Sequence, residues 1–562
     1  MSKKHRKNFP ASPAPEAFSD FNISDIIKQN RWLILSVLIL GLVVYLNSLT
    51  NQFVSDDIAE IQTNPDIQNL KYTLDRPFGF IRPLLYLLAV KIGGLRPIYF
   101  RLINILFHLG SIFLVYLIVM SLVKKKLVAF LTAGLLAIHP LLSEAVVWIS
   151  GGSYVQYSFF FLGSFLFYIH KNLNRYFFWY SILLYLLSLL SHTEMAVVLP
   201  LIFIIYEISF GNLKKNWHKI AILSVLAAVE VIVSFIHLQG RIVTLQSVHY
   251  QEQGFDNPLI QIPIALGNYF GLLIWPKGLT IYHSELSTGI PNYVLMLILA
   301  LIYFGLIVYF FIKDRRIFFW MSWIIIALSV TLLPFRWTWV VAERYFYLGS
   351  IGAFVGFSLL SDYLLNKFSR FKEVIYISLI IIFISLGLRT VLRNLDWSTA
   401  DNLWLSAETT SPSSPTNHNN LGDLYGRRKD YPRAIQEFKT AILLKPNYGD
   451  AYHNLGNAYA ETGDINNALI NYQKAIEFNP ALWQSYQNIA SIYYSQAKYP
   501  ESLDYIQKAI KINPQNPNLV YNLGIIYLKS GDKTRAIETL TILSQVFPNI
   551  PQYQQALTEA QK

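Results

Sequence analysis

The chain has 562 residues, of which 53% are hydrophobic and 14% are charged, and it contains no cysteine. Soluble proteins carry about 25% charged residues, so this composition excludes an ordinary soluble protein. The absence of cysteine excludes disulfide bonds and thiolate metal sites. Long apolar runs alternate with short basic clusters, which predicts several transmembrane helices. The net charge of +12 therefore reflects membrane orientation and does not predict a nucleic-acid partner.

Residues 1–30 are basic and then rich in proline and alanine, which predicts a disordered cytoplasmic tail. Residues 31–395 contain successive apolar segments and predict a polytopic, all-α membrane domain of about 11 spans. No small-residue cleavage site follows the first segment, so we interpret that segment as a retained anchor. The segments lie near residues 32–50, 99–121, 127–142, 154–170, 176–191, 195–210, 219–237, 292–312, 317–334, 345–361 and 373–391.

Basic clusters between these segments give the expected orientation. With eleven spans, every cluster falls on the same side, which the positive-inside rule makes cytoplasmic. The apolar stretch 258–276 would reverse this pattern if it spanned, so we interpret it as re-entrant, as interfacial, or as half of a pair of spans. The N-terminus is then cytoplasmic and the C-terminal part lies outside. The clusters surround Lys4, Lys125, Lys171, Lys215, Arg315 and Lys367.

After a linker at 396–414, a 34-residue period repeats four times through residues 415–550. The blocks are 415–448, 449–482, 483–516 and 517–550, and residues 551–562 read as a polar capping helix. Small residues, tyrosines and block-closing prolines recur at fixed positions, which is the tetratricopeptide pattern. Such repeats are helix pairs that stack into an α-solenoid with a concave groove. The positions in register include Gly422, Gly456, Ala490 and Gly524, and then Pro446, Pro480, Pro514 and Pro548.

One asparagine per block falls on the first helix of each pair, which faces the groove. These asparagines are Asn420, Asn454, Asn488 and Asn522. Their amides would hydrogen-bond an extended peptide backbone without reading its sequence. The alternative is that they only satisfy neighbouring groups within the stack. Either way, the repeats predict a protein or peptide partner.

The predicted topology gathers the ionisable groups least expected in a membrane protein on the outer face. The acidic pair Asp56-Asp57 follows the first span, and a carboxylate there would serve as a general base or hold a divalent cation. Two outer arginines, Arg336 and Arg344, run against the charge rule, and arginine is well suited to binding phosphate. Further candidates on this face are Arg82, His139, Glu144, His192, Glu194 and Glu343, with Lys277, His283 and Glu285 in a large outer loop. Glu230 is an intramembrane acid and a possible partner of an outer arginine.

Several segments together resemble a known family. They are FVSDDIAEI, RPLLYLLAV, NILFHLGSIFLVY, HPLLSEAVVWISGG, TEMAVVLPLIFIIYE and VAERYFYLGSIGAF. With the repeats that follow, they are similar to the transmembrane and tetratricopeptide O-mannosyltransferases, members of the GT-C glycosyltransferase class. The chain departs from the family where it reads Gly151-Gly152-Ser153-Tyr154 in place of a GRAD-like stretch. It also reads His192-Thr193-Glu194 where a Lys-Glu pair is common.

The resemblance implies transfer of a sugar, mannose in the family, from a polyprenyl-phosphate carrier to a Ser or Thr hydroxyl of a protein. Transfer would occur on the non-cytoplasmic face with inversion at the anomeric carbon. One of Asp56 and Asp57 would be the base, and Arg344 would bind the lipid phosphate beside Glu343. No cofactor is implied with certainty, and a divalent metal stays open. The absence of cysteine favours the inner membrane of a prokaryote over the endoplasmic reticulum of a eukaryote.

Two alternatives remain at the level of the sequence. A non-catalytic membrane scaffold would use only the repeats and would tolerate substitution of the acidic pair. A transporter would place polar residues or broken helices near the middle of the membrane, often in two related halves. The membrane part shows mainly Glu230 at that depth and no evident duplication.

Overall fold

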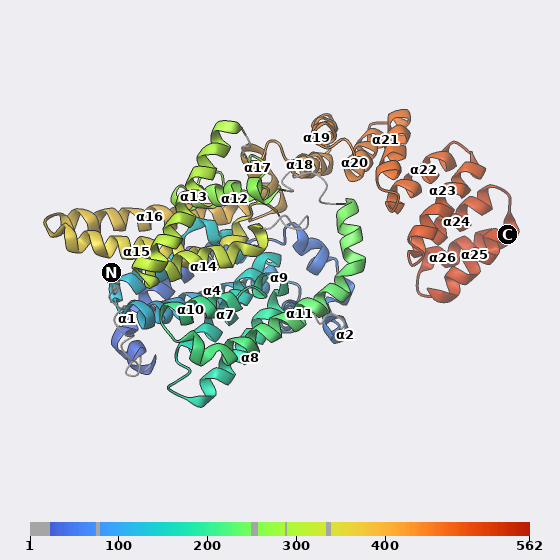
Figure 1. Cartoon of the computed structure of the whole chain (residues 1–562). Helices are drawn as coiled ribbons and strands as arrows, with labels where there is room; N and C mark the ends of the chain where they lie inside the picture. Colours follow the sequence, from blue (N-terminus) through green and yellow to red (C-terminus); the bar gives the residue numbers. More distant parts are fainter. Residues whose placement is uncertain (1–22, 75–78, 249–256, 287–288, 333–338) are drawn as a thin grey trace, which may run out of the picture. The chain divides into compact units, whose positions relative to one another are not determined.

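The computed structural model describes residues 23–74, 79–248, 257–286, 289–332 and 339–562. All regular structure in these ranges is helical (Figure 1). The chain divides into two compact units, Met1–Ser406 and Ala407–Lys562, each with its own core. The chain is thus an all-α protein with an apolar helical part and a C-terminal array of tetratricopeptide repeats.

The first unit consists of long apolar helices joined by short turns. Each of the eleven predicted segments overlaps a helix. Six helices are long and apolar enough to cross a membrane, or seven if the bent pair Lys126–Ile138 and Pro140–Val147 is one span, within the residues that the structure describes. The longer helices are α1 (Ile23–Tyr45), α3 (Ile81–Gly93), α4 (Pro97–Val123), α5 (Lys126–Ile138), α7 (Ser153–Ile169), α8 (Arg175–Ser191), α10 (Pro200–Ser209), α11 (Leu213–Val248), α12 (Pro258–Ile274), α13 (Ile290–Lys313), α14 (Arg315–Leu332), α15 (Ser350–Lys367) and α16 (Lys372–Asp396).

Helix α4 lies at the centre of this unit and packs against α1, α5 and α7. Two-thirds of its most apolar stretch is buried, whereas that of α13 is 6% buried and that of α16 is 11% buried. Helices that are apolar all round and yet exposed are those expected to contact lipid. The stretch 258–276, predicted to be re-entrant or interfacial, forms the 17-residue helix α12, which packs against α13 and α14.

Helix breaks at the ends of apolar helices place the polar residues. Helix α5 ends at Ile138 because His139 precedes a proline and is extended there, with φ −75° and ψ 124°. A 3-10 turn (Pro140–Leu142) and the short helix α6 (Ser143–Val147) follow, bent by 55° from α5. Similar breaks separate α8 from α9 (Thr193–Ala196) and place the 3-10 turn Glu343–Phe346 before α15.

The second unit is built from helix pairs that begin where the predicted blocks begin. The pairs are α18 (Pro415–Arg427) with α19 (Tyr431–Leu444), α20 (Gly449–Glu461) with α21 (Ile465–Phe478), α22 (Trp483–Ser495) with α23 (Tyr499–Ile512), and α24 (Pro517–Lys529) with α25 (Lys533–Val546). Helix α26 (Pro551–Gln561) packs against α25. Residues 396–414, predicted as a linker, contain the helix α17 (Ala400–Thr410).

The recurring glycines explain the close packing within the first, second and fourth pairs. A Cβ on Gly422 would lie 2.5 Å from the ring of Phe438, and one on Gly456 would lie 2.7 Å from the ring of Tyr472. These distances are shorter than a van der Waals contact, so only glycine fits. Asp430, Asp464 and Asp532 cap α19, α21 and α25 in the same way, each accepting from a backbone N–H in the first turn.

Candidate active site at the helix ends of the membrane unit

The loop that follows α1 is held in place by a buried arginine. Arg101, on α4, is fully buried and donates to three backbone carbonyls, those of Asn51 (2.7 Å), Gln52 (3.0 Å) and Val147 (2.9 Å). In the same loop, the backbone N–H of Gln52 donates to the carbonyl of Ser398 at 2.8 Å. This loop is therefore fixed to α4, to the end of α6 and to the end of α16.

The loop separates the two acids of the predicted pair. Ser55 adopts a left-handed conformation with φ 54°, and the two carboxylates that follow lie in different environments. Asp57 is fully buried and accepts from the Ser150 N–H (2.8 Å), the Ser150 hydroxyl (2.6 Å) and the Val54 N–H (3.3 Å). Asp56 is exposed.

The two environments give the acids different properties. Burial raises the pKa of Asp57 to about 6, although its hydrogen bonds and the charge of Arg101 oppose the shift. Asp57 is thus an anchored group that closes the loop onto Ser150. The negative charge of Asp56 interacts electrostatically with Arg82. Of the two acids, Asp56 is the one that lies where a substrate hydroxyl in solvent would reach a carboxylate.

Arg82 lies beside this pair. It stands at the start of α3, where its guanidinium forms an ion pair with Glu60 at 3.2 Å and approaches the Ser150 carbonyl at 3.5 Å. Its side chain is 31% exposed, so the guanidinium remains accessible to solvent although it is paired. Arg82 therefore offers a cation next to Asp56.

Glu144 and Arg344 form a buried ion pair across the unit. Glu144, on α6, accepts from the Arg344 backbone N–H at 2.9 Å and from its guanidinium. The guanidinium also lies over three aromatic rings, with centroid distances of 5.3 Å to Trp148, 5.8 Å to Tyr154 and 4.9 Å to Tyr345. Because its side chain is 11% exposed and its charge is compensated, Arg344 is tightly bound within the protein.

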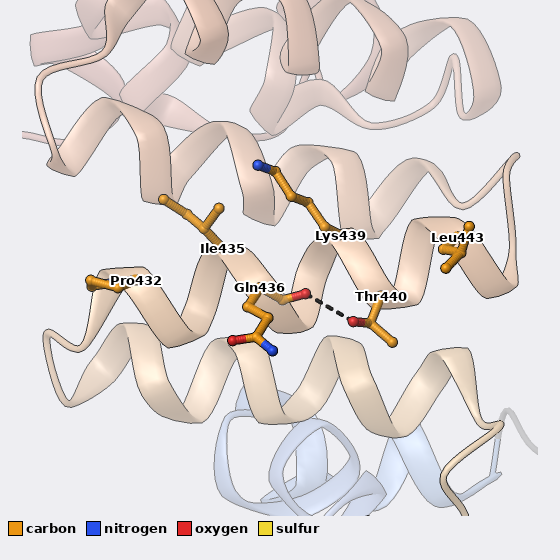
Figure 2. Close-up of a pocket in the computed structure, with 6 residues that line it drawn as sticks. All are labelled: Pro432, Ile435, Gln436, Lys439, Thr440 and Leu443. Atoms are coloured by element: carbon orange, nitrogen blue, oxygen red, sulfur yellow. Dashed lines mark hydrogen bonds between the residues drawn. The ribbon is translucent and has the colours of Figure 1, made fainter.

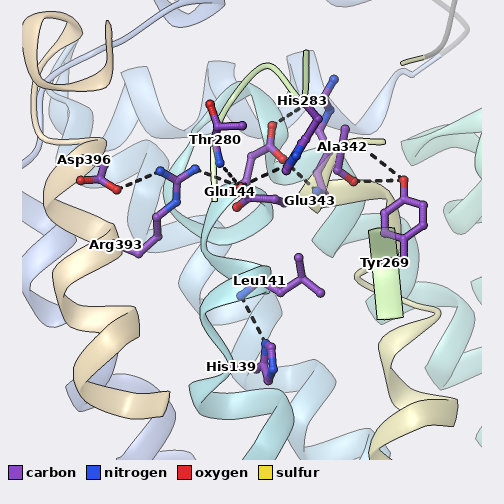
Figure 3. Close-up of polar contacts among 11 residues, drawn as sticks. His139, Leu141, Glu144, Tyr269, Thr280, His283, Ala342, Glu343, Arg393 and Asp396 are labelled. Atoms are coloured by element: carbon purple, nitrogen blue, oxygen red, sulfur yellow. Dashed lines mark hydrogen bonds and ion pairs between the residues drawn. The ribbon is translucent and has the colours of Figure 1, made fainter. Parts of the chain in front are cut away.

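Glu343 points toward the loop that follows α12 and toward the end of α16 (Figure 3). It accepts from the Arg393 guanidinium at 3.1 Å and from the Thr280 N–H, and His283 Nε2 lies 3.7 Å away. Arg393 is fully buried and also pairs with Asp396 at 2.8 Å. This network ties the turn before α15 to the loop after α12 and to α16.

His192 lies within reach of the charges of both Arg82 and Arg344. Its ring is 4.5 Å from Tyr154 and 5.8 Å from Tyr157, measured between centroids. Burial lowers the pKa of His192 to about 3, with further lowering by the positive charges of Arg82 and Arg344. Both arginines therefore direct their fields to the same place, where a negative group would be stabilised. Glu194 is exposed, and its charge acts on Tyr154.

The three remaining predicted residues have different outcomes. The structure does not bring His139 to this group, because its Nδ1 accepts from the Leu141 N–H at 3.3 Å and its Nε2 lies 2.9 Å from the Leu273 carbonyl (Figure 3). Arg336 lies outside the described residues. Glu230 accepts from the Thr193 hydroxyl at 3.0 Å, which differs from the expected arginine partner.

Sequence reasoning missed Arg101, Arg393 and Ser150. A signal for the two arginines exists, because each is a charged residue near the end of an apolar helix, and such residues are functional or structural by default. No comparable signal marks Ser150, a common residue in a loop.

The asparagines of the repeats are used in different ways. Asn454 donates to Asn419 at 3.0 Å, and Asn488 donates to Asn457 at 2.9 Å, so both bond to the preceding repeat. Asn522 lines a cavity, and Asn420 is half-buried on α18. Two of the four asparagines thus bond within the stack, and peptide binding by these residues stays a prediction. In the part of the chain that the structure describes, no three His, Asp or Glu side chains are grouped to hold a metal ion.

Comparison with known proteins agrees with the two-part architecture. Models described as TPR repeat match residues 422–463 and 490–531, and models described as tetratricopeptide repeat match 449–482 and 519–549. These matches lie within the predicted blocks, so the tetratricopeptide prediction is confirmed.

Longer relatives cover both parts of the chain. Human protein O-mannosyl-transferase TMTC3 is 25% identical over 73% of this chain and 51% of its own length. Drosophila protein O-mannosyl-transferase Tmtc1 is 24% identical over 73% of this chain and 61% of its own. The chain thus spans about half the length of the relatives that it matches. The resemblance predicted from the sequence is confirmed: over most of its length the chain is similar to the TMTC protein O-mannosyl-transferases.

Proposed function

We propose that this protein is a membrane glycosyltransferase that moves a sugar from a polyprenyl-phosphate carrier to Ser or Thr hydroxyls of protein acceptors. The sugar is mannose, as the names of its relatives suggest, and transfer takes place on the non-cytoplasmic face. The repeats recruit the acceptor. The membrane is the inner membrane of a prokaryote, or that of the endoplasmic reticulum if the organism is eukaryotic.

The observation that carries this proposal is the exposed carboxylate of Asp56 beside the partly exposed cation of Arg82. The acceptor oxygen attacks the anomeric carbon, and the bond from that carbon to the phosphate oxygen breaks. The hydroxyl proton passes to Asp56, and polyprenyl phosphate leaves with the bonding electron pair. Attack opposite the leaving group inverts the anomeric carbon. Arg82 then stabilises the additional negative charge on the phosphate.

Arg344 has a different role in this scheme. Its guanidinium is already paired with Glu144 and enclosed by aromatic rings. We infer that its positive charge acts at the position of His192 and that its guanidinium holds the rings of Tyr154 and Tyr345 in place. In this scheme Arg344 does not contact the lipid phosphate directly. The rings of Tyr154 and His192, which are inclined at 58° to each other, provide an angled aromatic surface for the sugar.

The test is sugar transfer by the full chain in lipid nanodiscs, with radiolabelled polyprenyl-phosphate mannose and Ser/Thr-containing peptides. Asp56→Asn is expected to reduce transfer by about 10²- to 10⁴-fold with unchanged thermal stability. Asp66→Asn, an exposed acid in the same loop, serves as the matched control and is expected to stay active. Full activity in Asp56→Asn would remove the proposed base. An inactive wild type with mannose and other sugars would favour the non-catalytic scaffold.

A further inference from the structure

The repeats contain a cavity between the third and fourth helix pairs. It has a volume of ≈ 250 Å³ and is formed by α22, α23 and α24. Tyr494 and Tyr521 contribute to its walls together with Ile525, and Ser491 and Asn522 add polar atoms. None of the residues that line it is charged.

The equivalent positions change character along the repeats. The position of Ile525 is occupied 34 residues earlier by Ser491, then by Asn457, then by Asp423. The position of Tyr521 likewise follows Gln487, His453 and Asn419. These positions are therefore polar or charged in the first three repeats and carry tyrosine and isoleucine only in the fourth, where both line the cavity.

We propose that this cavity is a side-chain subsite for an apolar residue of the acceptor polypeptide, such as leucine, isoleucine, methionine or phenylalanine. The acceptor binds as an extended, uncharged segment whose backbone continues from Asn522 toward the polar positions of the earlier repeats. This inference rests on the proposed function for the existence of a protein acceptor. It requires the acceptor to carry an apolar residue in addition to the Ser or Thr that reacts. The chemistry at Asp56 does not impose this requirement, because it involves only the reacting hydroxyl.

The dimensions and the charge of the cavity support this occupant. An apolar cavity of about 150 Å³ holds a molecule the size of benzene, so ≈ 250 Å³ accommodates one large side chain. A charged side chain would lose hydration there without gaining an opposite charge. Asn454 and Asn488 donate to the preceding repeats, whereas Asn522 lines the cavity, where its amide would hydrogen-bond the backbone of the proposed peptide.

A second depression does not qualify as a comparable site. It has a volume of ≈ 420 Å³ and is lined by α19 alone, from Pro432 to Leu443 (Figure 2). A single helix provides one wall, and Lys439 lies in the middle of it. A cavity with walls from three helices encloses a side chain on more sides and excludes water better.

Binding without any sugar donor tests the inference separately from catalysis. The full chain in nanodiscs is titrated into fluorescein-labelled, uncharged Ser/Thr peptides that carry leucine, alanine or lysine at one position, and anisotropy is measured. Replacing leucine by alanine is expected to weaken binding about 10-fold, and lysine should weaken it further. Ile525→Gln is expected to remove the preference for leucine. Ile542→Gln, an exposed isoleucine on α25, is the matched control and should keep it.

Ser491→Phe provides a second variant that fills the cavity instead of making it polar, and thermal unfolding verifies that each variant is folded. Equal binding of the leucine, alanine and lysine peptides, an unchanged preference in both folded variants, or no binding of any peptide would each overturn the inference. Leucine-dependent binding by a protein that transfers no sugar would support the subsite while overturning the proposed function. Sugar transfer that does not depend on the leucine would support the proposed function while overturning the subsite.

Discussion

The buried acid Asp57 allows a quantitative test of how the acidic loop is held. Asp57→Ala removes a carboxylate that accepts three hydrogen bonds, two from Ser150 and one from the Val54 N–H. Hydrogen bonds to a charged group contribute about 1.5–3 kcal/mol each, and buried donors left without a partner add a cost. We expect Asp57→Ala to lower the free energy of unfolding by about 3–5 kcal/mol.

A double-mutant cycle separates the hydroxyl contact from the rest. Ser150→Ala removes the hydroxyl that donates to Asp57 at 2.6 Å but keeps the backbone N–H. If this contact has the expected strength, Asp57→Ala and Ser150→Ala should show a coupling energy of about 1.5–3 kcal/mol. Urea unfolding of the detergent-solubilised protein, followed by tryptophan fluorescence, gives the four stabilities. A coupling below about 0.5 kcal/mol would contradict the geometry of the pair.

The pH dependence gives an independent readout of the same group. Burial raises the pKa of Asp57 from 3.8 to about 6, so the folded state retains a proton that the unfolded state loses. The contribution of Asp57 to stability is therefore largest below pH 4 and falls as the pH rises to about 6. The loss amounts to about 2–3 kcal/mol. Asp57→Asn cannot titrate, so the stability of wild type relative to this variant should fall over that range. A difference that does not change with pH would refute the reasoning.

Three further predictions concern stability, each measured by thermal or denaturant unfolding. Arg101→Lys cannot reach all three carbonyls and should cost about 2–4 kcal/mol, whereas a cost below about 1 kcal/mol would contradict the assigned contacts. Gly456→Ala should cost about 1–3 kcal/mol by overpacking a tyrosine ring, while Gly426→Ala, with open space around it, should be neutral or stabilising. Glu437 raises the pKa of His418, so His418→Gln should destabilise below the usual histidine pKa of 6.5 and lose this effect as the pH rises above the folded pKa.

The repeats could be predicted almost residue by residue from the sequence. Their signal is local and redundant, because a small residue, glycine or alanine, recurs every 34 positions and faces the second helix of its pair. Gly422 and Gly456 illustrate this, since each is required by an aromatic ring 16 residues later in its own block. The apolar helices were also predictable, because length and hydropathy are properties of a single segment. The number that spans was less so, since short helices such as α8 fall between a span and a buried helix.

Several ionisable residues of the candidate site could be selected from the sequence, but the contacts between them could not. The acidic pair, Glu144 and Arg344 stand out as ionisable groups among apolar residues. Which acid is buried depends on the left-handed backbone at Ser55 and on Ser150, which is 93 residues away. No periodicity in the sequence records either feature.

The arrangement of charges suggests why the site contains more ionised groups than the proposed reaction uses. Glu144 with Arg344 and Glu343 with Arg393 are buried pairs, and desolvating such a pair costs several kcal/mol per ion. Apolar residues of similar size would hold the same helices together without this cost. Each pair instead fixes a turn that interrupts an apolar helix, and these turns carry the groups that remain partly exposed.

The buried groups in turn hold the exposed groups in fixed positions. Asp56 and Arg82 are each anchored by other groups, because the loop of Asp56 is held through Asp57 and Arg101, while Arg82 is supported by Glu60 and the Ser150 carbonyl. In the proposed reaction, the base and the cation are thus each held by other parts of the protein, so that a hydroxyl and a phosphate would meet them in a fixed geometry. Separate anchoring of this kind is the property that a group-transfer site requires and that a scaffold has no reason to maintain.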